Sequence, residues 1–185
     1  MRTDARRNYD RLVAGAARAF AAHGTGASLE DIARRAGVGI GTLYRHFPAR
    51  EDLVDAVLRE HFDELRAEAE TLSAAHPPMT ALTAWLRAFT ARLTRYRGVS
   101  DELAGTLHEE GSETYRSCHA MRDAAVELIV AAQRAGDIRE DVAPGDVLAL
   151  AAAVAWVSER TGGAPAERAE TLLSMMIDGI RAQAR

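Results

Sequence analysis

The sequence of 185 residues has no lysine, a single cysteine and no apolar run approaching the roughly 20 residues that cross a bilayer. A lone Cys118 excludes a disulfide within the chain and is typical of a reducing compartment. The first residues, MRTDARRNYDR, lack the apolar core of a signal peptide. The exclusive use of arginine as the basic residue is attributed to a GC-rich genome rather than to function. These absences predict a soluble cytoplasmic protein with no membrane partner.

Motifs typical of enzymes are also missing. The sequence has no HExxH, no GxSxG, no GxGxxG after a strand and no phosphate-binding loop. His108, Glu109 and Glu110 are adjacent, so on a helix they point in different directions and do not converge on a metal. Cys118 and His119 fail as a nucleophile and base because neighbouring helical side chains diverge by about 100°. The sequence therefore predicts no catalysis, no metal and no cofactor.

Charge is divided unevenly along the chain. Residues 1–50 hold nine arginines and four acidic residues, a formal charge of +5. Residues 51–185 hold fourteen arginines and 23 acidic residues, a formal charge of −9. A basic head on an acidic body attracts a polyanion to one end only, although chance clustering is an alternative. The division agrees with a DNA-binding domain over 1–50 and a second domain over 51–185.

Residues 28–53, SLEDIARRAGVGIGTLYRHFPAREDL, have the pattern of two short helices joined by a glycine turn, followed by the start of a third. Ser28 can cap the first helix, and Asp31 can return a bond to the cap backbone. Gly37 stands where the chain leaves that helix with positive φ, which glycine adopts without strain. Leu43 points back toward the first helix. These features predict a helix-turn-helix whose second helix enters a DNA major groove.

The second helix of this motif offers a surface for DNA. Its start, near 39–42, presents backbone N–H groups and the positive end of the helix dipole. Thr42 and Arg45 are expected at base edges, with Arg45 able to form a bidentate pair with guanine. Ile40 can touch a thymine methyl group. A solvated surface charge is the alternative role for Arg45.

The segment from Thr25 to Leu53 resembles the DNA-binding domain of the TetR family of bacterial repressors. The resemblance rests on Ile32-Ala33, Ala36-Gly37-Val38, Gly41-Thr42-Leu43-Tyr44, His46-Phe47, Arg50-Glu51 and Leu53. Gly39 replaces the family's usual serine cap, and Arg50 replaces its usual lysine. Neither change opposes DNA binding, since glycine is an acceptable cap and arginine keeps the charge.

The resemblance implies phosphate contacts by Tyr44, His46 and Arg50. Alternatively, Tyr44 packs beneath the domain and His46 only caps a turn. Together with the residues derived above, the predicted DNA-binding set is Ser28, Gly39, Ile40, Gly41, Thr42, Tyr44, Arg45, His46 and Arg50.

The remaining sequence is helical in pattern, with no strand alternation, repeat or low-complexity tail. Apolar residues recur at helical spacing over 9–20, 53–72, 82–96 and 115–129, and a shorter piece follows Ser100. Pro144 is well placed to start a further helix. The sequence thus predicts an all-α fold. The resemblance implies about nine helices, a three-helix DNA-binding domain with the helix-turn-helix and then a larger ligand-binding and dimerisation domain.

The last two helical segments are unusually apolar. Residues 147–157, VLALAAAVAWV, are apolar on every side, and residues 169–180 carry a broad apolar stripe. These segments either complete the core of one chain or pack against a second copy, and the resemblance favours a homodimer. Two-fold symmetry also matches a palindromic site. The predicted interface residues are Val154, Leu173, Met176, Ile177 and Ile180.

The middle of the chain combines aromatic and apolar residues with a few polar groups, a composition typical of a small-molecule pocket. The candidate lining residues are Trp85, Phe89, Leu103, Leu107, Tyr115, Cys118 and His119. An ordinary hydrophobic core is the alternative. The sequence and the resemblance together predict a regulator that binds a palindromic DNA operator as a homodimer. It is expected to repress transcription until a small hydrophobic or amphipathic effector releases it. The alternative is a DNA-binding repressor or activator without an effector.

Overall fold

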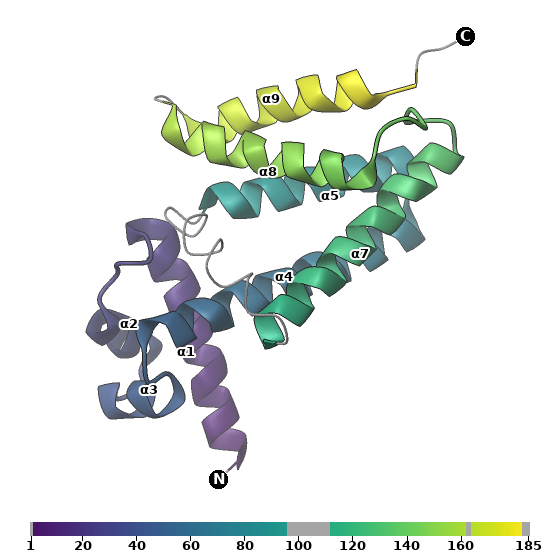
Figure 1. The fold of residues 1–185 in the computed structure, drawn as a ribbon. Coiled ribbons are helices and arrows are strands. Elements are labelled where there is room, and N and C mark those ends of the chain that lie inside the picture. The colour runs from purple at the N-terminus through teal and green to yellow at the C-terminus, as the bar shows by residue number, and fades with distance from the viewer. Residues whose placement is uncertain (1, 96–111, 162–163, 183–185) are drawn as a thin grey trace. The chain divides into compact units, whose positions relative to one another are not determined.

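The computed structural model describes residues 2–95, 112–161 and 164–182 (Figure 1). These residues form eight α-helices and, apart from one isolated bridge between Ile138 and Arg181, no β-structure. The helices are α1 (Arg2–His23), α2 (Leu29–Ala36), α3 (Ile40–His46), α4 (Arg50–Ala75), α5 (Pro78–Arg95), α7 (Glu113–Arg134), α8 (Pro144–Arg160) and α9 (Pro165–Ile180). The prediction of an all-α fold is confirmed. The expected total was about nine helices, and the short helix expected after Ser100 lies outside the described residues.

The chain divides into two compact units. Of the described residues, the first unit, or head, comprises 2–61 and 112–115, and the second unit, or body, comprises 62–95, 116–161 and 164–182. The head thus includes the segment expected to bind DNA together with the beginning of α4. None of the described helices is both long enough and apolar enough to cross a membrane.

The core of the head is built where α1 packs against α2 and α2 against α3. Leu12, Ala16 and Phe20 repeat at helical spacing on α1, and all three are fully buried. Gly15 lets α2 come close, because a Cβ at this position would lie 3.4 Å from the Ala36 Cβ. Burial of this apolar face fixes the helices on which the candidate DNA-binding surface is mounted.

The core of the body lies around α5, on which α8 and α9 pack while also packing on each other (Figure 1). Trp85 of α5 is fully buried, and its indole N–H donates to the Leu65 carbonyl of α4 at 2.8 Å. Its ring stacks on Phe89 with 5.2 Å between centroids. A buried indole that has both an apolar contact and a hydrogen-bond partner is a stabilising core residue. The body therefore has its own hydrophobic centre.

Candidate nucleic-acid interface and cavities of the body

The start of α2 is capped by Ser28. Its hydroxyl oxygen accepts the backbone N–H of Asp31 at 3.2 Å, which confirms the predicted cap. The Asp31 carboxylate instead accepts from Arg34 Nη2 at 2.6 Å, and this bond and charge hold the pKa of Asp31 below its usual value. The cap satisfies one of the free N–H groups at the helix start and so fixes where α2 begins.

The turn between α2 and α3 is locked by Gly37, whose φ is +64°. Its N–H donates to the Arg34 carbonyl at 3.1 Å, and the N–H of Val38 donates to the Ala33 carbonyl at 3.0 Å. This pair of bonds is the Schellman arrangement that ends a helix. A Cβ at Gly37 would also lie 2.5 Å from Nη2 of Arg11 on α1. The backbone angle therefore requires glycine, as predicted, while a side chain here would also have to displace the exposed Arg11 guanidinium.

The short helix α3 has an inward and an outward side. Leu43 is fully buried and attaches α3 to the head. Ile40 is 38% exposed, Tyr44 is 46% exposed, and Arg45 is also exposed, so these three side chains of the predicted DNA-binding set face solvent from α3. The structure places Tyr44 at the surface rather than beneath the domain. An outward face of this composition is available to a partner.

Two glycines leave the backbone of α3 uncovered at its start. A Cβ at Gly39 or Gly41 would meet no atom of the described chain within 4 Å. Arg45 Nε donates to the Gly41 carbonyl and Arg45 Nη2 to the Thr42 hydroxyl, both at 3.4 Å. These bonds are at the long end of the usual range, so they hold the guanidinium weakly. The face therefore combines bare backbone with a side chain that is easily redirected.

His46 and Phe47 are held against α1 by Tyr9. The Tyr9 ring lies 6.0 Å from the His46 ring in an edge-on arrangement and 5.1 Å from the Phe47 ring. Arg59 of α4 donates to the Tyr9 hydroxyl and to the Glu113 carboxylate. Half-buried His46 thus has a packing partner in the head, which its sequence position did not reveal.

Arg50, at the start of α4, is anchored to the loop before α2. Its Nη1 donates to the Thr25 carbonyl at 2.7 Å and to the Ala27 carbonyl at 2.6 Å. Bonds from a charged donor are stronger than neutral ones. The predicted phosphate contact would therefore come from the remaining N–H groups of a guanidinium that also ties two segments of the head together.

Two of the described residues predicted to line an effector pocket lie in one cavity of the body. Phe89 and Cys118 line a cavity of about 250 Å³ between α5, α7 and α8, together with Met121, Arg122 and Leu148 among others. Burial raises the pKa of the Cys118 thiol, so this side chain lines the cavity in its neutral form.

The other predicted pocket residues lie elsewhere. Trp85 belongs to the core of the body, His119 is exposed, and Tyr115 is a half-buried residue of the head. Leu103 and Leu107 lie outside the described residues.

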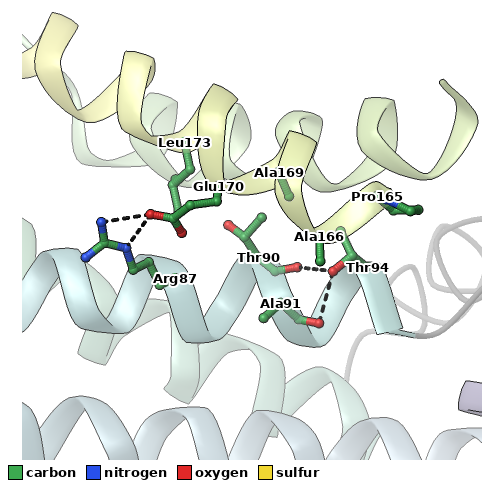
Figure 2. A pocket seen from close by; sticks show the side chains of 9 residues that line it. All are labelled: Arg87, Thr90, Ala91, Thr94, Pro165, Ala166, Ala169, Glu170 and Leu173. Carbon is green, nitrogen blue, oxygen red and sulfur yellow. Dashed lines mark hydrogen bonds and ion pairs between the residues drawn. The ribbon is translucent and has the colours of Figure 1, made fainter. Parts of the chain in front are cut away.

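A second cavity, of about 360 Å³, lies between α5 and α9 (Figure 2). Of the residues predicted for an effector pocket, those that the structure describes do not line it. Leu173, predicted for the dimer interface, does. Sequence reasoning missed this cavity because its walls come from segments about 80 residues apart, as the 83-residue separation of its Arg87–Glu170 ion pair indicates.

The predicted dimer residues are mostly inside a single chain. Leu173, Ile177 and Ile180 are 1%, 4% and 7% exposed, so they have almost no surface left for a partner, while Val154 and Met176 are half-buried. Large apolar side chains are exposed at other positions of the same two helices. They are Leu150, Trp156 and Val157 on α8 and Met175 on α9. The stripe that spacing revealed on α9 is its core-facing side.

Comparison with known proteins agrees with this architecture. Residues 12–57 match the bacterial regulatory proteins of the tetR family, and residues 77–182 match the C-terminal domain of SbtR-like transcriptional regulators. A solved TetR transcriptional regulator from Streptomyces coelicolor is 39% identical, with a TM-score of 0.75 over 95% of this chain and 99% of that one. A TetR regulatory protein from Mycobacterium vanbaalenii is 36% identical, with a TM-score of 0.72 over 98% and 99% of the two chains.

A curated HTH-type transcriptional regulator of Staphylococcus aureus is 41% identical over 46 residues. This match spans 25% of the chain and 24% of that protein, or about a quarter of each. The likeness to the two solved regulators, by contrast, covers nearly the whole chain. The resemblance inferred from the helix-turn-helix residues is thus confirmed, and the chain belongs to the TetR family of bacterial transcriptional regulators.

Proposed function

We propose that the chain is a transcriptional repressor, a homodimer that binds a palindromic operator and leaves it when a small hydrophobic or amphipathic effector binds to the body. The observation that carries the proposal is the outward face of α3. It combines exposed Ile40, Tyr44 and Arg45 with two glycines that leave backbone uncovered. Helix-turn-helix proteins place such a helix in the major groove, where its first residues reach base edges.

Each side chain of this face has a proposed role. Arg45 and Thr42 read base edges, and Ile40 contacts a thymine methyl group. Tyr44 and His46 bind phosphates, which fix the register of the protein on the duplex. The bare backbone at the start of α3 lets the helix lie close to the DNA. The surplus of arginine over acidic residues in 1–50 attracts this end of the chain to the polyanion.

We assign the dimer interface to the exposed apolar side chains of α8 and α9. Leu150, Trp156, Val157 and Met175 are between 37% and 66% exposed. Contiguous exposed apolar patches on soluble proteins commonly mark interaction sites. A second copy of the chain supplies the matching apolar surface, and its two-fold symmetry suits an inverted repeat. Leu173, Ile177 and Ile180 then support this surface from inside the chain.

The cavity between α5, α7 and α8 supports an effector site. Phe89, Met121 and Leu148 give it apolar walls, the Cys118 thiol is neutral, and Arg122 is the one charged residue among its described lining. This composition suits a hydrophobic or amphipathic molecule and favours a ligand-responsive repressor over one without an effector. Release from DNA requires that the effector bind the DNA-free conformation more tightly than the DNA-bound one. Because its target is bacterial DNA, we place the protein in the cytoplasm.

Selection of bound sequences from a random DNA pool by the purified protein, at near-physiological salt, tests the proposal. We expect enrichment of one inverted repeat. The Arg45→Ala variant should lose preference at one base position in each half-site while keeping the repeat spacing. Salt-sensitive binding without any enriched sequence would contradict a sequence-specific regulator. A reporter gene with the selected repeat across its promoter then measures whether the protein lowers or raises transcription. Activation instead of repression would overturn the assignment as a repressor.

A further inference from the structure

The cavity between α5 and α9 is separate from the proposed effector site. Among the residues that the structure describes, the two cavities share no lining residue. Figure 2 shows one wall coming from α5 and the other from α9, with Arg87 and Glu170 at one end. Its volume of about 360 Å³ falls within the range of small-molecule sites.

Thr90 supplies the cavity with a polar group that has no partner in the described part of the chain. This threonine is 2% exposed, and its hydroxyl oxygen makes no hydrogen bond within the described chain. Figure 2 shows its side chain pointing from α5 toward α9. One turn later, the Thr94 hydroxyl bonds back to the Thr90 and Ala91 carbonyls, both at 3.1 Å, the common solution for a helical threonine. Buried polar groups usually have partners, so an unpaired hydroxyl in the wall of a cavity is available to a molecule that enters it.

The rest of the lining defines what that ligand is. Ala91, Ala166, Ala169 and Leu173 are small or apolar, so they leave room for an apolar body and offer it no hydrogen bond through their side chains. The two charged residues of the cavity, Arg87 and Glu170, bind each other with 2.8 Å between Nη2 and Oε1. Because these charges already neutralise one another, the cavity favours a neutral molecule over an ion.

We infer that this cavity binds a small neutral amphipathic molecule with an apolar ring or chain and one hydroxyl or carbonyl group. The apolar part lies against Ala169 and Leu173, and the polar group pairs with the Thr90 hydroxyl. Binding here does not depend on the proposed repressor function. Only the consequence for DNA affinity does, since the ligand would brace α9, which carries the exposed Met175.

Phenol and toluene are a matched pair of probes, since they have the same size and differ in a hydroxyl against a methyl group. The full-length protein with ¹³C-labelled leucine and methionine methyl groups is titrated with each. Leu173 reports on this cavity and Met121 on the cavity between α5, α7 and α8. We expect both probes to shift the Leu173 signals, with phenol binding about threefold to tenfold more tightly because of one neutral hydrogen bond. Shifts confined to Met121, no shift at Leu173, or equal affinities would overturn the inference.

The Thr90→Val variant removes the hydroxyl and keeps the shape of the side chain. Phenol should then bind no more tightly than toluene, and the ligand-free variant should melt at the same temperature as the parent or higher. A retained preference for phenol, or a melting temperature several degrees lower, would show that the hydroxyl acts within the fold and would overturn the inference. Operator binding is measured without phenol in the same samples. If the parent protein fails to bind the operator, that result contradicts the repressor proposal. The phenol and toluene titrations still decide whether this cavity is a binding site.

Discussion

The outward faces of α3 and of the α8–α9 pair differ in a way that indicates two kinds of partner. The face of α3 has uncovered backbone and an arginine beside exposed Ile40 and Tyr44, whereas the other has leucine, tryptophan, valine and methionine. Uncovered backbone and cationic groups suit a hydrated polyanion, and large apolar side chains suit another protein surface. In both places a buried leucine, Leu43 or Leu173, holds the helix from its other side. Changes on the inner side should therefore damage the fold, and changes on the outer side should damage binding alone.

The largest expected effect comes from comparing two single variants on α9, Leu173→Glu and Met175→Glu. Leu173 is 1% exposed, so its replacement buries a charge in an apolar core and should cost about 4 kcal/mol or more, enough to unfold much of the protein. Met175 is 66% exposed, so its replacement should leave the helix content unchanged and shift the protein from dimer to monomer.

Circular dichroism and analytical ultracentrifugation, at one fixed protomer concentration, check the two outcomes. If Leu173→Glu folded normally and was monomeric, Leu173 would have to be assigned to the dimer interface rather than to the core of the chain. A dimeric Met175→Glu, Leu150→Glu double variant would place the interface elsewhere.

The next effect concerns Arg50, whose side chain both forms hydrogen bonds within the head and is proposed to bind a DNA phosphate. Arg50→Ala should destabilise the head by roughly 2 kcal/mol, because the Thr25 and Ala27 carbonyls lose a charged donor. If the remaining N–H groups also bind a phosphate, DNA affinity should fall and the salt dependence should decrease by about one ion. Urea unfolding and DNA titrations at several salt concentrations measure the two effects. Lost stability with an unchanged salt slope would assign Arg50 to the fold alone.

Local features of the helix-turn-helix could be predicted from the sequence because they depend on neighbouring residues. The Ser28 cap and the Gly37 turn each involve bonds to residues no more than a few positions away. Arg50 could not be predicted in the same way, since the carbonyls it binds lie 23 and 25 positions earlier. The resemblance implied a phosphate contact for Arg50, but only the tertiary structure shows its protein partners, the Thr25 and Ala27 carbonyls.

The body was less predictable for the same physical reason. Periodicity identifies an apolar stripe such as Leu173, Ile177 and Ile180, but it cannot tell whether the stripe faces the chain's own core or a second copy. Cavities depend on how the sizes of facing side chains match across distant segments. Thr90 gave no signal in the sequence, because Arg87 and Thr94 stand three and four positions away on the same helix face and make a polar residue there unremarkable. Its unpaired state is visible only once α9 is in place.

A moderate effect is expected at the turn that supports α3. Gly37→Ala should cost about 1–2 kcal/mol, because an L-residue is strained at φ +64°. The added Cβ must also displace the Arg11 guanidinium. Gly26→Ala is the matched control, since its φ is not positive and a Cβ there meets nothing within 4 Å. Thermal unfolding of both variants makes the comparison. Equal stability would contradict the assignment of Gly37 as the position that fixes the turn.

The smallest change in stability is expected for Gly41→Ala. This variant also separates most clearly the effect of α3 on folding from its effect on DNA binding. A Cβ here meets nothing within 4 Å, and alanine favours a helix over glycine by up to about 1 kcal/mol, so the variant should be slightly more stable. Its operator affinity should nevertheless fall, because the methyl group occupies space that the DNA needs next to the backbone. Gly179→Ala in α9, where a Cβ is equally unobstructed, should gain stability without losing affinity if it remains dimeric. Unchanged DNA binding by Gly41→Ala would mean that α3 does not approach the duplex through its bare backbone. Its exposed side chains would then have to account for recognition.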